Sequence, residues 1–506
     1  MLLLGAALRL YDLSGVPTEL IADELDLYNS VQSIVTTGHD IDGTLKPFLA
    51  SRFTRNPPMY APFGYASTLV FGKNPFGLRF PAAAFGVIAV LLAGAIAYEL
   101  TRRRDIALVA ALVQATQPIF VHFSRVAWEP ASELPFLLGG LYVLLRAARR
   151  GFAFKEVALG ALLLGLTSYT YMAGWFYALV LGGGFMLLAA LCSHARRVWL
   201  ASLGALAIWC LVSAPALWMI VADPVTRGKV ARVATFSGGL SWQTLGMFFS
   251  NYAKHFAWSY LVTTGDPQPG ETWRYLVGFG AFYWWVIPLV AIGLLFTSRY
   301  VRERSSQLWL WLWFLAYPLG GALTNEAIPN APRTLAGAPA FSILAALGFA
   351  AVLDGARAIA PRRLKSAAGP ALWTLLAANA LLSVVLFSQY YFTQYVHVYS
   401  NAWSSGSSAL FAQIRARSAQ YSRLCFSVHP AWFATGVYFR FYLSGVPLQQ
   451  IKNVTDPRCY LRGTLIATDW NDPISRPGFT ELTRIKDVDG NFYAILYGRR
   501  SFDSAR

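Results

Sequence analysis

Long apolar stretches recur along this chain and limit what it can fold into. A helix that crosses a bilayer needs about 20 mostly apolar residues. Such stretches lie near residues 77–101, 106–122, 129–146, 156–171, 174–193, 198–222, 275–298, 307–325, 333–353 and 370–389. Residues 1–10 are apolar but much shorter, and we interpret them as part of a first helix. The pattern predicts an all-α polytopic membrane bundle of about 11 transmembrane helices.

The composition excludes the other broad classes of protein. Hydrophobic residues make up 56% of the 506 residues and charged residues 13%, whereas a soluble domain is about a quarter charged. Too little polar surface remains for a soluble globular protein. An aromatic content of 15% excludes a disordered chain. The apolar runs are continuous rather than alternating, which argues against a β-barrel.

Basic residues are unevenly shared among the short loops. Clusters of arginine and lysine occupy alternate loops, at 102–104, 146–155, 196–197, 299–304 and 357–365. The positive-inside rule makes these loops cytoplasmic. The longer segments 11–76, 223–273 and 390–506 then lie on the outer face. We attribute the formal charge of +17 to this topology and to anionic lipids rather than to nucleic acid.

The last polar segment is long enough to form a small domain. We divide the chain into a transmembrane domain, 1–395, and a soluble extracytoplasmic domain, 396–506. The second combines a helical stretch near 407–419 with short β-like runs, which predicts an α/β fold. These runs are Leu424–Val428, Thr464–Thr468 and Phe492–Leu496. Cys425 and Cys459 can pair if this domain lies outside the cytoplasm.

Three tryptophans stand at the start of one apolar stretch, at positions 309, 311 and 313. Tryptophan is enriched where helices meet the membrane–water interface. We therefore interpret Trp309, Trp311 and Trp313 as part of an interfacial aromatic belt.

Acidic residues are scarce, and three of them cluster after the first apolar stretch. Asp23, Glu24 and Asp26 precede Tyr28 in a segment, 20–34, whose apolar residues recur at helical spacing. This spacing predicts a surface helix in the first outer loop, with carboxylates at the water-filled mouth of the bundle. A carboxylate there can act as general base toward an acceptor hydroxyl. The alternative is a solvated helix face or an N-cap.

Basic residues on the predicted outer side form a second group. They are Lys46, Arg52, Arg55, Arg79, Arg125, Arg227, Lys229, Arg232 and Arg333. Such cations can clamp a phosphate group. The alternative for any one of them is contact with lipid head groups. Arg125 and Arg333 stand out because they break the charge asymmetry of the loops.

No motif for a metal or a nucleotide is present. The six histidines include no pair at ligand spacing, and HExxH, P-loop and GxGxxG patterns are absent. We therefore expect no organic cofactor and assign no metal ligands, while the sequence leaves a metal requirement open.

Six short motifs follow one another along the transmembrane domain. They are Asp23-Glu24-Leu25-Asp26-Leu27-Tyr28, Asn56-Pro57-Pro58-Met59-Tyr60, Leu78-Arg79-Phe80-Pro81, Phe123-Ser124-Arg125-Val126-Ala127, Thr264-Gly265-Asp266 and Pro329-Asn330-Ala331-Pro332-Arg333. Each is weak singly. Their order, with the predicted topology, resembles the C-type membrane glycosyltransferases, in particular the group of bacterial lipid A aminoarabinose transferases and protein O-mannosyltransferases.

This resemblance implies a sugar transferase that uses a polyprenyl-phosphate-linked donor on the outer face of a bacterial inner membrane. The acceptor would be a hydroxyl of a lipid, protein or polysaccharide. The implied residues are Asp23 and Glu24 for catalysis, Lys46, Arg55, Arg79, Arg125 and Arg333 for the donor phosphate, and Asp26, Tyr28, Asp266 and Asn330 as further candidates. The aminoarabinose transferases have a phosphate-binding lysine before the Pro-Pro pair, where this chain has Asn56. We expect Arg55 or Lys46 to replace that lysine.

A transporter or flippase for a lipid-linked or anionic solute is the main alternative, and a non-catalytic scaffold is a third. The predicted spans hold few ionisable groups near the membrane centre. No pair of broken helices recurs in two matching halves of the sequence. Long loops gathered on one face also favour the transferase over the transporter.

Overall fold

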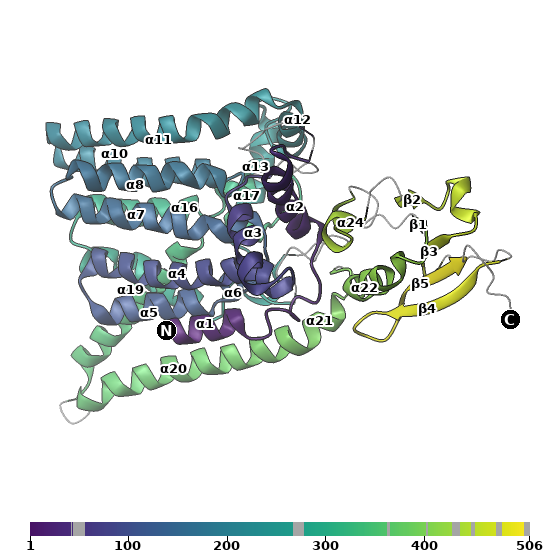
Figure 1. Ribbon diagram of the computed structural model, residues 1–506. Coiled ribbons are helices and arrows are strands. Elements are labelled where there is room, and N and C mark those ends of the chain that lie inside the picture. Colours follow the sequence, from purple (N-terminus) through teal and green to yellow (C-terminus); the bar gives the residue numbers. More distant parts are fainter. Residues whose placement is uncertain are drawn as a thin grey trace.

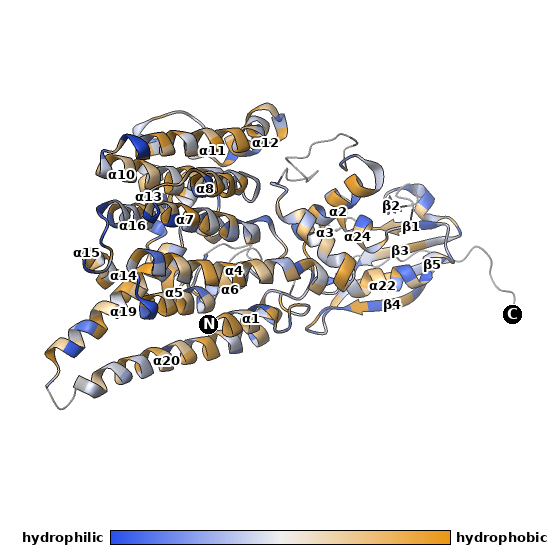
Figure 2. Cartoon of the chain, turned by 60° about the vertical axis from the view of Figure 1, so that its left-hand side comes forward, coloured by the Kyte–Doolittle hydropathy of each residue, from blue (hydrophilic) through white to orange (hydrophobic). Residues whose placement is uncertain are grey.

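A bundle of long helices and a small mixed sheet make up the fold (Figure 1). The structure, a computed structural model, describes residues 1–41, 43, 56–266, 278–361, 365–400, 403–427, 436–446, 451–471 and 478–499. Figure 2 shows hydrophobic residues along the bundle helices and strongly hydrophilic ones near several of their ends. This distribution is typical of helices that lie in a membrane.

The bundle is built from helices that lie side by side (Figure 1). They are α1 (Leu2–Leu10), α4 (Pro75–Thr101), α5 (Arg104–Thr116), α7 (Glu133–Arg149), α8 (Phe154–Leu166), α10 (Gly184–Ser193), α11 (Arg196–Ala222), α14 (Val286–Leu295), α16 (Arg304–Ala316), α19 (Pro339–Ile359) and α20 (Lys365–Gln389). Shorter helical turns join some of them: η1 (Glu129–Ser132), η2 (Thr167–Tyr169), α9 (Gly174–Tyr177), η3 (Ala178–Gly183), α15 (Thr297–Tyr300) and η6 (Tyr390–Gln394).

Within the described residues, six helices are long and apolar enough to cross a membrane. They are Pro75–Thr101, Glu129–Arg149, Gly174–Ser193, Arg196–Ala222, Pro339–Ile359 and Ser366–Val398. The predicted helical membrane bundle is thus confirmed, whereas the predicted number of about 11 spans is not. Proline explains two of the differences: Pro118 separates α5 from α6 (Pro118–Phe123), and Pro318 follows the end of α16. Proline lacks the N–H that would continue a helix.

The basic loops gather at one end of the bundle. Arg149, the last residue of α7, lies 3.4 Å from Glu99 near the end of α4. Arg103, before α5, pairs with Asp354 of α19 at 2.5 Å. Tyr300, at the end of α15, donates its hydroxyl to the same carboxylate. Loops far apart in sequence therefore share one end, as the charge asymmetry predicts.

The interpretation of the three tryptophans is corrected by the structure. Trp309 and Trp313 are fully buried and donate their indole N–H groups to backbone carbonyls of Leu181 and Ala336. Trp311 alone is substantially exposed. Positions four apart lie on one face of α16, and here that face packs into the bundle rather than lying at the interface.

Short helices cover the opposite end of the bundle. They are α2 (Ala22–Thr37), α3 (Tyr60–Phe71), α6, α12 (Pro224–Val233), α13 (Trp242–Lys254), η4 (Ser259–Thr263), α17 (Leu319–Ala322) and α18 (Ala331–Thr334). Both views place α2 and α3 between the bundle and the sheet (Figures 1 and 2). The helix predicted in the first outer loop is therefore present as α2, and it lies between the bundle and the sheet.

The C-terminal part is a small α/β unit that follows α20 through α21 (Tyr395–Val398). Its elements are α22 (Ser407–Ser418), β1 (Arg423–Phe426), α24 (Val437–Tyr442), β2 (Ile451–Asn453), η8 (Pro457–Tyr460), β3 (Thr464–Asp469), β4 (Thr480–Lys486) and β5 (Phe492–Arg499). The sheet has the order β2-β1-β3-β5-β4, parallel among the first three strands and antiparallel at β5 and β4. Cys425 and Cys459 form the predicted disulfide.

Candidate functional site

Helix α2 begins with the acidic cluster, and all three of its carboxylates are buried. Asp23 is 6% exposed, Glu24 is fully buried and Asp26 is 3% exposed. Ordinary carboxylates are rarely this buried unless they are paired. Asp23 and Glu24 lie in the first turn, where a helix dipole stabilises negative charge. The alternative of a solvated helix face therefore does not apply to the start of α2. The alternative of an N-cap agrees with the acidic residues in its first turn.

Glu24 is held by a dense set of bonds. Its carboxylate accepts N–H groups from Arg79 at 2.9 Å, from the Ala127 backbone at 2.8 Å and from the Ile21 backbone at 3.0 Å. The Arg79–Glu24 pair has no solvent exposure on either side chain. Glu24 thereby ties the start of α2 to α4 and to the segment after α6.

Arg79 points into the protein. Besides Glu24, its guanidinium donates to the backbone carbonyls of Pro17 and Glu19, each at 2.6 Å. Arg125 is also fully buried and donates to carbonyls of Leu8 and Val16, both at 2.9 Å. Both arginines, predicted as phosphate ligands, donate in this structure to carbonyls of α1 and of the segment between α1 and α2.

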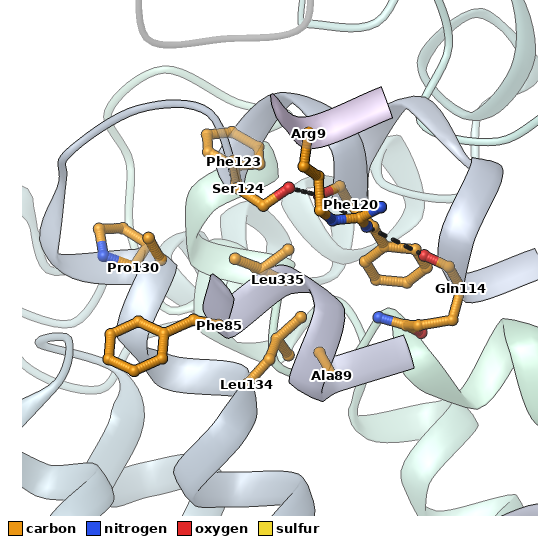
Figure 3. Close-up of a pocket in the computed structure, with 12 residues that line it drawn as sticks. Arg9, Phe85, Ala89, Gln114, Phe120, Phe123, Ser124, Pro130, Leu134 and Leu335 are labelled. Atoms are coloured by element: carbon orange, nitrogen blue, oxygen red, sulfur yellow. Dashed lines mark hydrogen bonds between the residues drawn. The ribbon is translucent and has the colours of Figure 1, made fainter. Parts of the chain in front are cut away.

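Arg9 is a third buried arginine, which sequence reasoning missed. It lies in α1 and donates to carbonyls of Gly5 and Ala115, both at 3.0 Å. Figure 3 shows it beside Ser124 and Gln114, at a pocket that has space for about one water molecule. This pocket is too small for a sugar, so we regard it as a packing gap. The sequence signal that could have identified Arg9 is a single basic residue within an apolar run.

A second cluster joins two predicted motifs far apart in sequence. Asp266 accepts the backbone N–H of Ala331 at 3.1 Å, and the Asn330 side chain caps α18 through the Arg333 N–H at 3.1 Å. The Asn330 backbone N–H donates to Nε2 of His255 at 3.0 Å. The structure therefore brings Asp266, Asn330 and Arg333 together, with His255 as an unpredicted member.

The charges of this second cluster follow from their surroundings. Burial lowers the pKa of His255 to about 4, so its ring is neutral and can accept the Asn330 N–H. The Arg333 guanidinium donates to the Thr324 hydroxyl at 2.7 Å and lies 3.2 Å from a carboxylate oxygen of Glu326. Its side chain is 17% exposed, unlike those of Arg79 and Arg125.

Helix α12 links the first outer loop to this second cluster. The Lys229 amine donates to the side-chain oxygen of Asn56 at 3.1 Å. The far end of α12 pairs with the segment before Arg333, through the Asn325 N–H and the Val233 carbonyl at 2.8 Å. A lysine from the second loop thus stands beside Asn56, the residue before the Pro-Pro pair. Sequence spacing gave no sign of this pairing.

The C-terminal unit covers the outer part of α2. The Asn29 side chain donates to the Val437 carbonyl at 2.8 Å, and the Tyr28 ring contacts Phe441 edge-on at 5.1 Å. The Ser408 hydroxyl donates to Glu19 at 2.6 Å. Burial raises the pKa of Glu19, partly offset by that hydrogen bond. Tyr28, a further candidate from the sequence, therefore lies in the contact between the two parts.

Two predicted phosphate ligands, Lys46 and Arg55, lie outside the described residues. Within the described ranges, no group of three His, Cys, Asp or Glu side chains is arranged to hold a metal ion. Helix α12 contacts Asn56 of the first outer loop through Lys229, and the segment before Arg333 through Val233. The described residues thus include three buried carboxylates at the start of α2, and two less buried cations, Lys229 and Arg333, in α12 and α18.

Part of this chain matches a known family in sequence, and its fold is similar to that of solved structures. Residues 55–218 match the family described as dolichyl-phosphate-mannose-protein mannosyltransferase. No curated protein sequence matches the chain. The structure of ArnT from Cupriavidus metallidurans bound to undecaprenyl phosphate superposes with a TM-score of 0.56 at 13% identity, covering 97% of this chain and 96% of ArnT.

A second relative in fold is the Archaeoglobus fulgidus oligosaccharyltransferase tethered to an acceptor peptide. It superposes with a TM-score of 0.53 at 14% identity, over 90% of this chain and 63% of that enzyme. Its complex with zinc and sulfate gives a TM-score of 0.54 at 13% identity, over 98% and 72% of the two chains. The chain thus has the fold of the C-type membrane glycosyltransferases, and its resemblance to that group is confirmed.

Proposed function

We propose that this protein is an integral-membrane glycosyltransferase that moves a sugar from a polyprenyl-phosphate donor to an acceptor hydroxyl. The family match over residues 55–218 and the shared fold support glycosyl transfer in general. One structure with this fold holds undecaprenyl phosphate, which supports a donor of that chemistry. The observation that carries the proposal is the acidic start of α2, buried and fixed at the end of the bundle that faces the C-terminal unit.

Asp23 is the general base in this proposal. It precedes Glu24, whose carboxylate is fixed by Arg79 and two backbone N–H groups, so the backbone at position 23 is held in place. A preorganised base saves the entropy of orienting it during the reaction. Asp23 takes the proton of the acceptor hydroxyl while that oxygen bonds to the sugar. The sugar–phosphate bond breaks, and the phosphate leaves with the bonding electrons.

The cations divide into two roles. Arg79 and Arg125 position the segment between α1 and α2, because their N–H groups are directed to backbone carbonyls and to Glu24. Lys229 lies on α12 and Arg333 on α18, and we assign the leaving phosphate to them. Lys46 and Arg55 stay predicted ligands of the same phosphate. Cations that neutralise a departing phosphate lower the barrier to its release.

Orientation follows from two further features. The basic loops gather at the end of the bundle opposite α2 and the C-terminal unit, and short basic loops stay in the cytoplasm. The Cys425–Cys459 disulfide is typical of an oxidising compartment. We therefore place the site and the unit formed by residues 396–506 on the outer face of a bacterial inner membrane.

The test is a donor panel with the full-length protein in liposomes. Polyprenyl phosphates carrying different sugars are supplied with candidate lipid, peptide and polysaccharide acceptors, and free polyprenyl phosphate is quantified by mass spectrometry. Release that depends on both protein and one donor supports the proposal. Movement of an intact donor between leaflets, with no cleavage of its sugar–phosphate bond, would instead establish the transporter.

A further inference from the structure

A large apolar cavity lies in the bundle, away from α2. It has a volume of about 420 Å³ and lies among α8, η3, α10 and α11. Its walls include Leu164, Met186 and Trp209. The hydroxyl of Ser202, also in the wall, already bonds to the carbonyls of Met186 and Val198. A cavity of this size and lining suits a hydrocarbon rather than a sugar or an ion.

Glycine keeps this cavity open. Gly182, Gly183 and Gly184 stand in a row where the π-helical turn η3 passes into α10. A Cβ at Gly183 would meet only the tip of the Leu179 side chain, at 3.4 Å. Leu203 and Leu206 of α11 also line the space, and they are 59% and 45% exposed. The cavity is therefore bounded partly by side chains at the outer surface of the bundle, within reach of membrane lipid.

The length of the cavity corresponds to one leaflet. Its α11 wall runs from Trp199 to Trp209, a rise of about 15 Å at 1.5 Å per residue. The hydrocarbon core of a bilayer is about 30 Å thick. Trp199 lies close to the start of α11 and is 39% exposed, as expected for a residue at the interface. The cavity thus extends from one interface to about the membrane centre.

Positive charge stands at the interfacial end of the cavity. Arg196 and Arg197 open α11 and are both exposed. Among the residues that the structure describes, neither forms an ion pair. The Arg197 guanidinium lies over Gly151, 3.5 Å from where a Cβ would stand there, so the cation is near the α7–α8 connection. Two unpaired arginines at a lipid-facing slot attract an anionic head group.

We propose that this cavity binds one acyl chain of an anionic phospholipid whose phosphate lies beside Arg196 and Arg197. The lipid would fill the space between α8, α10 and α11 on the side of the basic loops. The site is independent of the proposed glycosyl transfer, because it lies at the other end of the bundle from α2.

The test is native mass spectrometry of the full-length protein, delipidated in detergent and titrated with phosphatidylglycerol or phosphatidylcholine of equal chain length. Wild type is expected to retain one phosphatidylglycerol. Gly183→Leu fills the cavity and should reduce this binding at least tenfold. The matched control is Gly204→Leu on α11, where nothing lies within 4 Å of the added Cβ and no wall of the cavity is altered. If Gly183→Leu does not fold, Ala205→Leu fills the cavity from its α11 wall and replaces it in the test.

A second set of variants tests the preference for an anionic head group. Arg196→Gln and Arg197→Gln should each lower the preference for phosphatidylglycerol over phosphatidylcholine by about fivefold, whereas Arg302→Gln should not. Wild type that retains neither lipid, or retains both equally, would overturn the proposal. So would equal phosphatidylglycerol binding by wild type, Gly183→Leu and Ala205→Leu.

Discussion

Three arginines, Arg9, Arg79 and Arg125, are fully buried around the start of the first outer segment. A buried guanidinium is tolerated only when its N–H groups find acceptors. Here backbone carbonyls supply most of these acceptors, and Glu24 supplies a carboxylate to Arg79. At the level of single residues, Arg79 and Arg125 hold the segment that leads to Asp23, whereas Arg9 holds α1 against α5.

The Glu24→Gln substitution tests this positioning role. It leaves the Arg79 charge buried without its partner, which costs about 3–5 kcal/mol of stability. We expect a clear fall in the melting temperature of the detergent-purified protein, measured by differential scanning fluorimetry. Glu481→Gln is the matched control, because its partner Arg484 is exposed, and it should melt like wild type. Equal melting of both variants would contradict the positioning role.

Lys229 and Arg227 form a second matched pair at this scale. Lys229→Gln removes the cation beside Asn56, so the KM for the polyprenyl-phosphate donor should rise about tenfold, as for a lost charge-assisted hydrogen bond. Arg227 lies on the same helix but is exposed, and Arg227→Gln should leave KM unchanged. Steady-state kinetics with the active donor measure both. A similar KM for the two variants would remove Lys229 from the site.

At the scale of elements, α2 is clamped between the bundle and the C-terminal unit. Lys73, just before α4, lies in the same contact, with its amine 5.1 Å from the centre of the Tyr28 ring and 4.6 Å from that of Phe441. Aromatic faces attract a cation, but burial opposes its charge. Burial, helped by Arg415, lowers the pKa of Lys73 to about 8.

This shift predicts a pH dependence of stability. The pKa of Lys73 is about 8 in the folded protein and 10.5 for the ordinary side chain. Between these values the unfolded chain binds the proton that the folded protein has lost, so stability rises with pH from about 8 to 10.5 and is flat below. Melting temperatures across this range should rise more for wild type than for Lys73→Met. Parallel curves would contradict the prediction.

The disulfide of the C-terminal unit joins β1 to η8 across 34 residues. Alkylation without reduction should label only Cys192 and Cys210, which are both exposed, and reduction should add two labels by mass. Removal of the bond by Cys425→Ala with Cys459→Ala should cost about 2–4 kcal/mol. Four labels on the exported, unreduced protein would show that the bond does not form.

At the scale of the whole molecule, apolar runs predict the bundle well, because a membrane helix is defined by its own length and hydrophobicity. The number and the boundaries of the helices are harder to predict, because Pro118 and Pro318 break apolar runs into shorter helices. In the C-terminal unit, β1, β3 and β5 match predicted strands. β4 was missed because its sequence, Thr480–Lys486, is mostly polar and lies at a sheet edge.

The candidate site was only partly predictable. The acidic motif and the Asp266 and Asn330 motifs mark residues that the structure brings into α2 and into one cluster. The partners of the arginines were not predictable, because they are backbone carbonyls with no sequence signature. The Lys229–Asn56 contact likewise joins residues 173 positions apart. The arginine–carbonyl bonds and the Lys229–Asn56 contact both depend on how the outer segments fold over the bundle.

The most direct measurement of the central claim compares Asp23→Asn with wild type in donor cleavage. The substitution keeps the shape of the side chain but removes its basicity, so kcat/KM should fall at least a hundredfold, as for loss of a general base. Donor binding and melting temperature should stay near wild type, and Asp456→Asn, at a partly exposed acidic site on the C-terminal unit, should retain full activity. Wild-type turnover by a folded Asp23→Asn protein would contradict the account.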